Sequence, residues 1–226
     1  MKTLIPFHSI SLLNKTKIEG VNKDGMVCTV LVGAALEAFL HDLQAWYKSV
    51  FESKLGINRN LRNGVIRVDN DYFEITSDEV ELMNFLQKLE QDREPISSKY
   101  LKISAKLDVN PYQVGRAPFQ DFSDLIKIRN LLVHLKTEPL RVDSDNKSIL
   151  KESYPKVIRN LVQRKHIDDS LVNDSWINAL NCEPFVHWLR KTYAEIVADI
   201  LFSLPETDIS QFFKEQYYFA IGADRY

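Results

Sequence analysis

Apolar residues recur at intervals of three and four positions through most of the chain, and this spacing predicts amphipathic helices. The longest such stretch covers residues 27–55 and presents one broad apolar face. The other expected helices cover residues 78–89, 97–107, 118–136, 156–166 and 183–204. We expect four or five of these helices to pack as an antiparallel bundle.

Two stretches depart from the helical pattern. Residues 63–76 place turn-forming residues around two short runs of β-branched and aromatic residues, which predicts a small β-hairpin inserted into the bundle. Residues 137–155 are rich in polar side chains and follow directly on the helix at 118–136. We therefore expect a long polar loop at the end of that helix, where it shapes access to any site nearby.

Polar residues also mark where two helices begin. Ser77 or Asp78 is suited to cap one helix, and Glu81 is spaced to complete a capping box with Asp78. Asn181 is a suitable N-cap for the helix at 183–204.

Composition supports a single all-helical domain. The chain has 226 residues, of which 45% are hydrophobic and 27% are charged, as in soluble globular proteins. Only 7 Gly and 8 Pro are present, too few for the frequent turns of an all-β fold. We therefore expect residues 1–226 to form one all-α domain, an antiparallel helical bundle with a hairpin insertion.

The net charge and the length of the longest apolar run limit the kinds of partner that we expect. The formal net charge of −2 disfavours a high-affinity duplex-DNA binder but leaves room for a small basic site. Cys28 and Cys182 form no CxxC pair, so we expect reduced thiols. The apolar run at 26–36 is shorter than the roughly 20 residues that span a bilayer, and no secretory signal is evident. We expect a cytoplasmic protein without a membrane partner.

The segment at 118–136 carries a polar stripe beside its core-facing line. The core-facing line consists of Leu125, Ile128, Leu132 and Leu135. The polar stripe consists of Ser123, Lys127, Asn130 and His134. Such a stripe is usually the solvated face of an amphipathic helix. Arg129-Asn130 followed by His134 indicates a more specific role.

Arg129-Asn130-Leu131-Leu132-Val133-His134 resembles the Arg-x4-His signature of the HEPN superfamily, the higher eukaryotes and prokaryotes nucleotide-binding domains. Residues 34–40 resemble the acidic helix that opens many stand-alone prokaryotic HEPN proteins, and residues 183–204 lie where such bundles close. The hairpin and the loop at 137–155 are departures from that family.

The resemblance implies a metal-independent endoribonuclease, often a toxin or antiviral effector with an antidote protein as partner. RNA supplies its own nucleophile, the 2′-hydroxyl, so the enzyme must move protons and stabilise charge on phosphorus. Histidine exchanges protons near neutral pH, which suits His134 to proton transfer. Arg129 offers planar paired donors to a phosphate. Asn130, one turn before His134, is expected to orient the imidazole.

Other residues are expected to support this site. Lys127 and Lys136 are candidate substrate-binding cations, and Glu37 is expected to pair with Arg129 or with the bundle interior. Either a structural ion pair or a catalytic role remains open for Glu37. No HExxH motif, CxxC pair or carboxylate cluster suggests a metal site, and no glycine-rich phosphate loop is present. We expect no cofactor.

On an ideal helix Arg129 and His134 point about 140° apart, so one chain cannot easily aim both at a single phosphate. Two copies related by a twofold axis can do so. The family precedent agrees, and we expect a homodimer through the helix at 118–136. Two alternatives stay open: a non-catalytic HEPN module that binds RNA or a nucleotide, and a helical interaction protein in which the motif is accidental.

Overall fold

The all-helical class is confirmed by the computed structural model, which describes residues 7–52, 65–68, 71–74, 76–107, 112, 115–134, 154–168 and 175–222. In chain order, the elements are α1 (His8–Lys15), the 3-10 turn η1 (Val21–Lys23), α2 (Gly25–Glu52), β1 (Val65–Val68), β2 (Asp71–Glu74), α3 (Ser77–Gln91), α4 (Ile96–Lys106), α5 (Phe119–Val133), α7 (Lys156–Gln163), α8 (Trp176–Ala179), α9 (Glu183–Ser203) and α10 (Asp208–Ile221).

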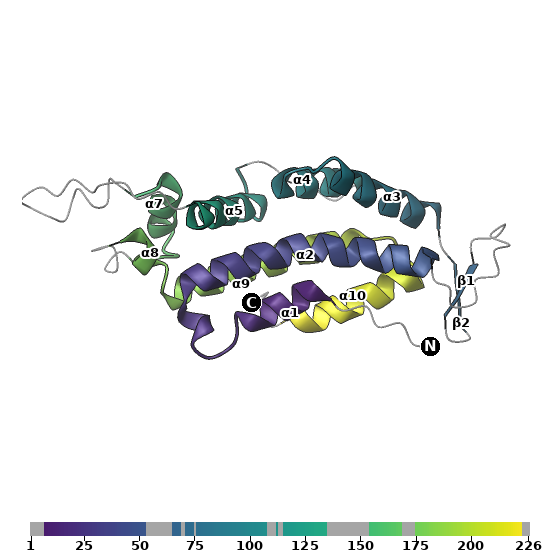
Figure 1. Ribbon diagram of the computed structural model, residues 1–226, viewed down its shortest axis with the longest axis horizontal. Helices are drawn as coiled ribbons and strands as arrows, with labels where there is room; N and C mark the ends of the chain where they lie inside the picture. The colour runs from purple at the N-terminus through teal and green to yellow at the C-terminus, as the bar shows by residue number, and fades with distance from the viewer. Residues whose placement is uncertain are drawn as a thin grey trace, which may run out of the picture.

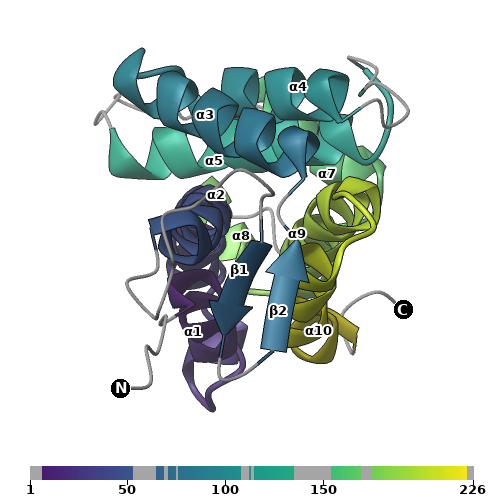
Figure 2. The ribbon, with the colours of Figure 1, turned by 90° about the vertical axis from the view of Figure 1, so that its right-hand side faces the viewer.

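Helices α2 and α9 form the centre of the molecule (Figure 1). Helices α3, α4 and α5 cover one side of this pair, and α1 and α10 cover the other (Figure 2). The buried side chains of α2 and α9 explain this central position, because both helices are apolar on more than one face. Fully buried examples are Val32, Leu36, Phe39, Leu43, Leu189, Tyr193, Val197 and Leu201.

Helix α2 is also apolar enough to raise the question of a membrane. By length and composition, Gly25–Phe51 satisfies the criterion for a helix that can cross a bilayer. A core helix satisfies the same criterion, and 56% of the apolar window is buried within the structure. The absence of a membrane partner therefore stays a prediction.

Strands β1 and β2 pair antiparallel between α2 and α3 in the chain order. Val65 lies opposite Glu74, and Val68 lies opposite Asp71. Figure 2 shows the two strands at one end of the helical body, beside α10.

The cap of α3 lies earlier than the sequence suggested. Thr76, rather than Ser77 or Asp78, accepts a hydrogen bond from the Glu79 backbone at 3.4 Å, and the Glu79 carboxylate accepts one from the Thr76 backbone at 3.1 Å. This capping box is preferred because Glu79 is buried and also accepts hydrogen bonds from Thr207 and Ser210 at the start of α10. Glu81 instead pairs with Lys106 of α4 at 2.7 Å.

Asn181 does not cap α9, whose N-cap is Cys182. Its side-chain oxygen accepts a hydrogen bond from the backbone of Gly25 at 2.9 Å, so it serves the start of α2 instead. The close approach of the two segments explains this, since a Cβ on Gly25 would lie 2.0 Å from the Leu180 carbonyl oxygen. A side chain at position 25 is therefore excluded.

Three helices were not expected: α1, the short α8 and α10. Thr207 caps α10 by accepting from the Ser210 backbone at 3.1 Å. Helix α5 is shorter than the expected 118–136, because His134 has left the helical conformation (φ −115°, ψ 39°). Most of the polar stretch at 137–155 lies outside the described residues.

Candidate active site

Helix α5 holds the three motif residues at its C-terminal end. Its core line is buried as expected at Leu125, Ile128 and Leu132, which fixes the helix on α2 and α9. Leu135, the last position of that line, lies outside the described residues. The opposite side of α5 faces solvent, and there Asn130 and His134 are exposed while Arg129 is half-buried.

Arg129 lies across the surface of α2. A Cβ built on Gly33 would be only 3.1 Å from Cγ of Arg129, so the glycine provides the space in which the arginine stem lies. One turn further along α2, Glu37 Oε1 is 3.2 Å from Nη2 of Arg129. The expected pairing of Glu37 with Arg129 is therefore present in the structure. The side chains are 29% and 42% exposed, which is typical of a surface ion pair.

Asn130 contacts Arg129 through its side chain. Its Oδ1 accepts a hydrogen bond from Nη1 of Arg129 at 3.2 Å. Among the described residues, no side-chain hydrogen bond joins Asn130 to the imidazole of His134. The link between these two residues is the backbone bond from His134 N to the Asn130 carbonyl, at 3.0 Å. The geometry thus makes Asn130 a partner of the guanidinium, rather than the expected orienting group for histidine.

His134 is the C-cap of α5, and its side chain is exposed. His134 and Arg129 lie at the same end of α5. Asn130 is hydrogen-bonded to both, to Arg129 through its side chain and to His134 through its backbone carbonyl. Because a guanidinium and an imidazole can bind phosphate and move protons, respectively, this helix end carries groups suited to phosphodiester chemistry.

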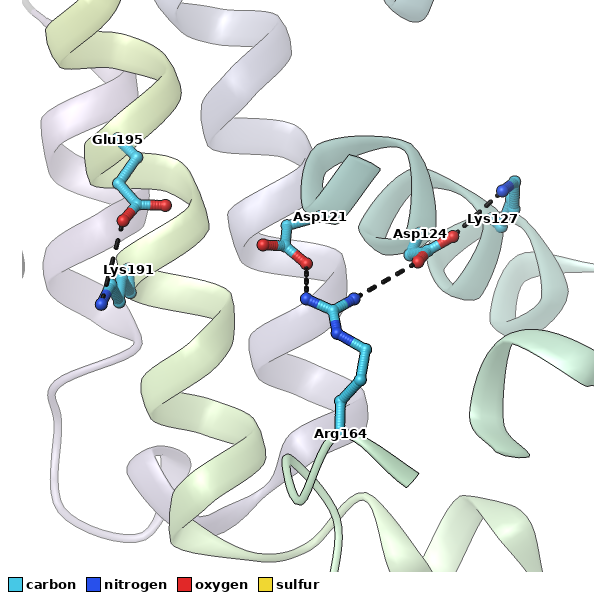
Figure 3. A network of polar contacts seen from close by, with 6 residues as sticks. All are labelled: Asp121, Asp124, Lys127, Arg164, Lys191 and Glu195. Carbon is cyan, nitrogen blue, oxygen red and sulfur yellow. Dashed lines mark hydrogen bonds and ion pairs between the residues drawn. The ribbon is translucent and has the colours of Figure 1, made fainter. Parts of the chain in front are cut away.

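Of the two expected substrate-binding lysines, Lys127 and Lys136, the structure describes only Lys127. Lys127 Nζ lies 3.0 Å from Oδ1 of Asp124, a buried carboxylate on the same helix. Arg164, which follows α7, binds the other Asp124 oxygen at 3.7 Å and also pairs with Asp121 (Figure 3). Lys127 is thus partly neutralised, although its side chain is 57% exposed. Lys136 lies outside the described residues.

Large apolar side chains are exposed around the motif. Leu131 and Val133 lie on α5 between the motif residues, and Val133 is 54% exposed. Met26 and Val30 are exposed on α2, within two turns of the Gly33 position that contacts Arg129. Exposed apolar groups beside a polar motif are a common mark of a protein contact surface.

A groove of about 190 Å³ adjoins the Arg129–Glu37 pair. It is formed by α2, α3 and α4 and is lined by Glu37, Leu40, His41, Glu90, Glu94, Ile96 and Lys99. Its carboxylates are largely matched by lysines, since Lys99 pairs with Glu90 and Lys102 with Glu94. The hydrogen bond from Lys99 lowers the pKa of the Glu90 carboxyl below its ordinary range. The groove is therefore polar but locally balanced in charge.

Sequence reasoning missed both Gly33 and this groove. A glycine one turn before Glu37 on a long helix was the available signal for Gly33, because glycine inside a helix needs a packing reason. No local signal marked the groove, whose lining comes from three helices. Within the part of the chain that the structure describes, no group of three or more His, Cys, Asp or Glu side chains is placed to hold a metal ion.

The fold and the motif define a helical protein with Arg129, Asn130 and His134 at one helix end, where Asn130 and His134 are exposed. No known family model matches the chain, and no curated protein or solved structure matches it.

Proposed function

We propose that this chain is a metal-independent endoribonuclease of the HEPN type, in which Arg129, Asn130 and His134 form the active centre. One observation carries the proposal: a guanidinium held over α2 by Gly33 and Glu37 lies on the same helix end as an exposed histidine. In the HEPN-like arrangement, α2 corresponds to the acidic helix, α5 to the motif helix and α9 to the helix at 183–204, while α1 and α10 lie outside the expected set.

The proposed reaction needs only groups that RNA and the motif supply. The 2′-hydroxyl loses its proton to the His134 imidazole, and its oxygen bonds to the adjacent phosphorus as the P–O5′ bond breaks. The imidazolium then returns a proton to O5′. The products are a 2′,3′-cyclic phosphate and a 5′-hydroxyl end. Arg129 binds the non-bridging phosphate oxygens through two parallel hydrogen bonds.

Glu37 and Asn130 position Arg129 in this scheme. Both lie within hydrogen-bonding distance of its guanidinium, at 3.2 Å each. They restrict a long and flexible side chain before RNA binds, so less conformational entropy is lost when the phosphate contact forms. Glu37 is a positioning residue, because nothing in the scheme requires it to touch RNA.

The active unit is a homodimer that meets through α5. The apolar side chains of Met26, Val30, Leu131 and Val133 support this, because a second copy would remove them from water. We expect Val133→Glu to give a monomer with weak cleavage. Phe219→Glu, on a residue of α10 that is 95% exposed, is the matched control and should change neither property. Sedimentation of the unaltered chain as a monomer at micromolar concentration would argue against the composite site.

The cellular role that fits this activity is that of a toxin or antiviral effector, with an antidote protein as partner. Expression of the parent chain should slow growth, and His134→Ala should relieve the effect. A parent that is harmless while it still cleaves RNA in vitro would argue against the toxin role alone.

A second candidate is a non-catalytic HEPN module that binds RNA or a nucleotide. The engagement of Arg129 by Glu37 favours it, because a phosphate must compete with a carboxylate that is already bound. Incubation of the purified chain with mixed RNA separates the two functions, since only the nuclease produces new 5′-hydroxyl ends.

A further inference from the structure

Helix α7 has two chemically distinct faces. Val157, Ile158 and Leu161 are buried, whereas Lys156 and Arg159 on the other side are exposed. Lys165, just beyond the end of the helix, is exposed as well. Helix α7 itself contains no Asp or Glu, and the next acidic residues are Asp168 and Asp169. We call Lys156, Arg159 and Lys165 the α7 basic ridge.

Lys156 is not placed where a cation stabilises the helix. The first turn of α7 has no acidic residue, and Lys156 is its first residue. Helix N-termini are stabilised by negative charge, so a lysine there is unfavourable for the fold. Lys165 has φ 61°, a left-handed conformation that glycine adopts with less strain. The helix dipole therefore does not explain a lysine at position 156, and the backbone conformation does not favour a side chain at position 165.

Arg164, next to the ridge, has a structural role instead. It reaches from α7 to Asp121 and Asp124 of α5, and both carboxylates are buried (Figure 3). The contact holds α7 against the helix that carries Arg129, Asn130 and His134. The ridge is therefore fixed relative to the active site, and its side chains form no ion pair with any other described residue.

We propose that the α7 basic ridge binds the phosphate backbone of single-stranded RNA next to α5. The identity of the ligand rests on the proposed function, and the charge of the ridge supplies the complementarity. Exposed cations along α7 and just beyond its end suit a backbone that offers phosphates in series, without a requirement for base sequence. The ridge supplies affinity, while the motif on α5 supplies the chemistry.

The test is a salt titration of binding, followed by fluorescence anisotropy. The probe is a fluorescein-labelled, single-stranded 2′-O-methyl oligoribonucleotide of mixed sequence, which the proposed reaction cannot cut. The altered chain carries Lys156→Gln, Arg159→Gln and Lys165→Gln. Its matched control carries Lys15→Gln, Lys88→Gln and Arg93→Gln, which remove the same charges from exposed positions on α1 and around the end of α3. Arg93, like Lys165, has a positive φ, of 51°.

Removal of one phosphate-binding cation lowers the slope of log affinity against log salt by about 0.7 for a single strand. The ridge variant should therefore show a slope smaller by about 2, with affinity at least tenfold lower (an order-of-magnitude expectation) at low salt. The control should keep the parental slope. Circular dichroism tests whether both variants are folded. If the ridge variant proves unfolded, Lys165→Gly, which relieves the positive φ, should still lower the slope by about 0.7.

An unchanged slope and affinity in the folded ridge variant overturns the inference. If cleavage of ordinary RNA still depends on His134 in that case, the proposed function stands without the ridge. If the parent binds the probe but cleaves no RNA, and the ridge variant loses binding, RNA binding by the ridge is supported and the proposed nuclease activity is overturned. Failure of the parent to bind the probe overturns the ridge.

Discussion

Gly33 offers a way to move Arg129 without changing any charge at the site. The arginine stem lies on this glycine, and a Cβ at position 33 would be 3.1 Å from Cγ, 3.7 Å from Cβ and 3.8 Å from Cδ of Arg129. Gly33→Ala therefore requires the stem to shift by a few tenths of an ångström. Gly33→Leu requires the stem to leave α2, because the added side chain fills the space that the stem occupies.

The expected stability effects are small. Replacing glycine by alanine inside a helix contributes about 0.8–1 kcal/mol through helix propensity. A strained arginine rotamer costs about 0.5–1.5 kcal/mol, and the surface ion pair with Glu37 contributes about 0.2–1 kcal/mol. Because these terms oppose one another, we expect the free energy of unfolding of both variants to lie within about 1 kcal/mol of the parental value. This corresponds to a change in melting temperature of about 2–4 °C.

The activity effects should separate the two variants. Gly33→Ala should keep RNA cleavage within about tenfold of the parent, since the guanidinium still reaches Glu37. Gly33→Leu should lower cleavage as far as Arg129→Ala does, about 10²-fold, which is typical of misplaced binding groups. Ala45→Leu adds the same side chain at an exposed position of α2 and should leave cleavage unchanged. Urea unfolding and initial cleavage rates measure both properties.

Full activity in a folded Gly33→Leu chain would show that Arg129 does not act from its place on α2. A loss of more than about 2 kcal/mol in Gly33→Ala would show that the glycine is required by the helix packing rather than by the arginine stem, since surface changes usually stay within about 0.5 kcal/mol.

Three further predictions concern the groups around the site. Arg164→Ala should lower the free energy of unfolding in urea by about 2 kcal/mol. This is less than the roughly 3–5 kcal/mol lost when a fully buried ion pair is broken, because Arg164 is 37% exposed. A change of less than about 0.5 kcal/mol would contradict its anchoring role. Arg129→Lys should restore only part of the cleavage lost in Arg129→Ala, because an ammonium cannot form the paired contact, and equal rates for lysine and arginine would refute the clamp. Shortening residues 137–155 should change which RNAs are cut, as read by sequencing of product ends, and a complete loss of cleavage in a folded dimer would contradict a role in access alone.

The helical class and most helix positions could be predicted from the sequence because burial on one side imposes a local period. Residues 27–55 and 183–204 were expected to be helical, and α2 and α9 lie within two or three residues of these limits. Helix α10 was missed although its signals are local: Thr207 caps it, and Ile209, Phe213, Tyr217 and Ile221 are buried at intervals of four.

The capping and anchoring contacts could not be predicted because their partners are distant in the sequence. Asn181 has the properties of a local N-cap, but Gly25 reaches its side chain only once α2 and the segment before α9 are packed together. Likewise, the choice of Thr76 over Asp78 depends on Glu79 contacting the start of α10.

The candidate site shows the same division. The i, i+4 and i, i+5 relations of Arg129, Asn130 and His134 are local and follow from the helix. The contact of Arg129 with Gly33 and Glu37 joins two helices, and only the Glu37 pairing was anticipated.

The most direct test of the central claim is incubation of purified chain with a mixed RNA pool in EDTA. The parent should cleave it and leave 5′-hydroxyl ends, with no cleavage of the same sequences as 2′-O-methyl RNA. His134→Ala should lower the rate by about 10²–10⁴, the usual contribution of general acid–base catalysis. His187→Ala, at an exposed histidine of α9, should match the parent. If His134→Ala cleaves as fast as the parent, or EDTA abolishes cleavage, the account of this site is wrong.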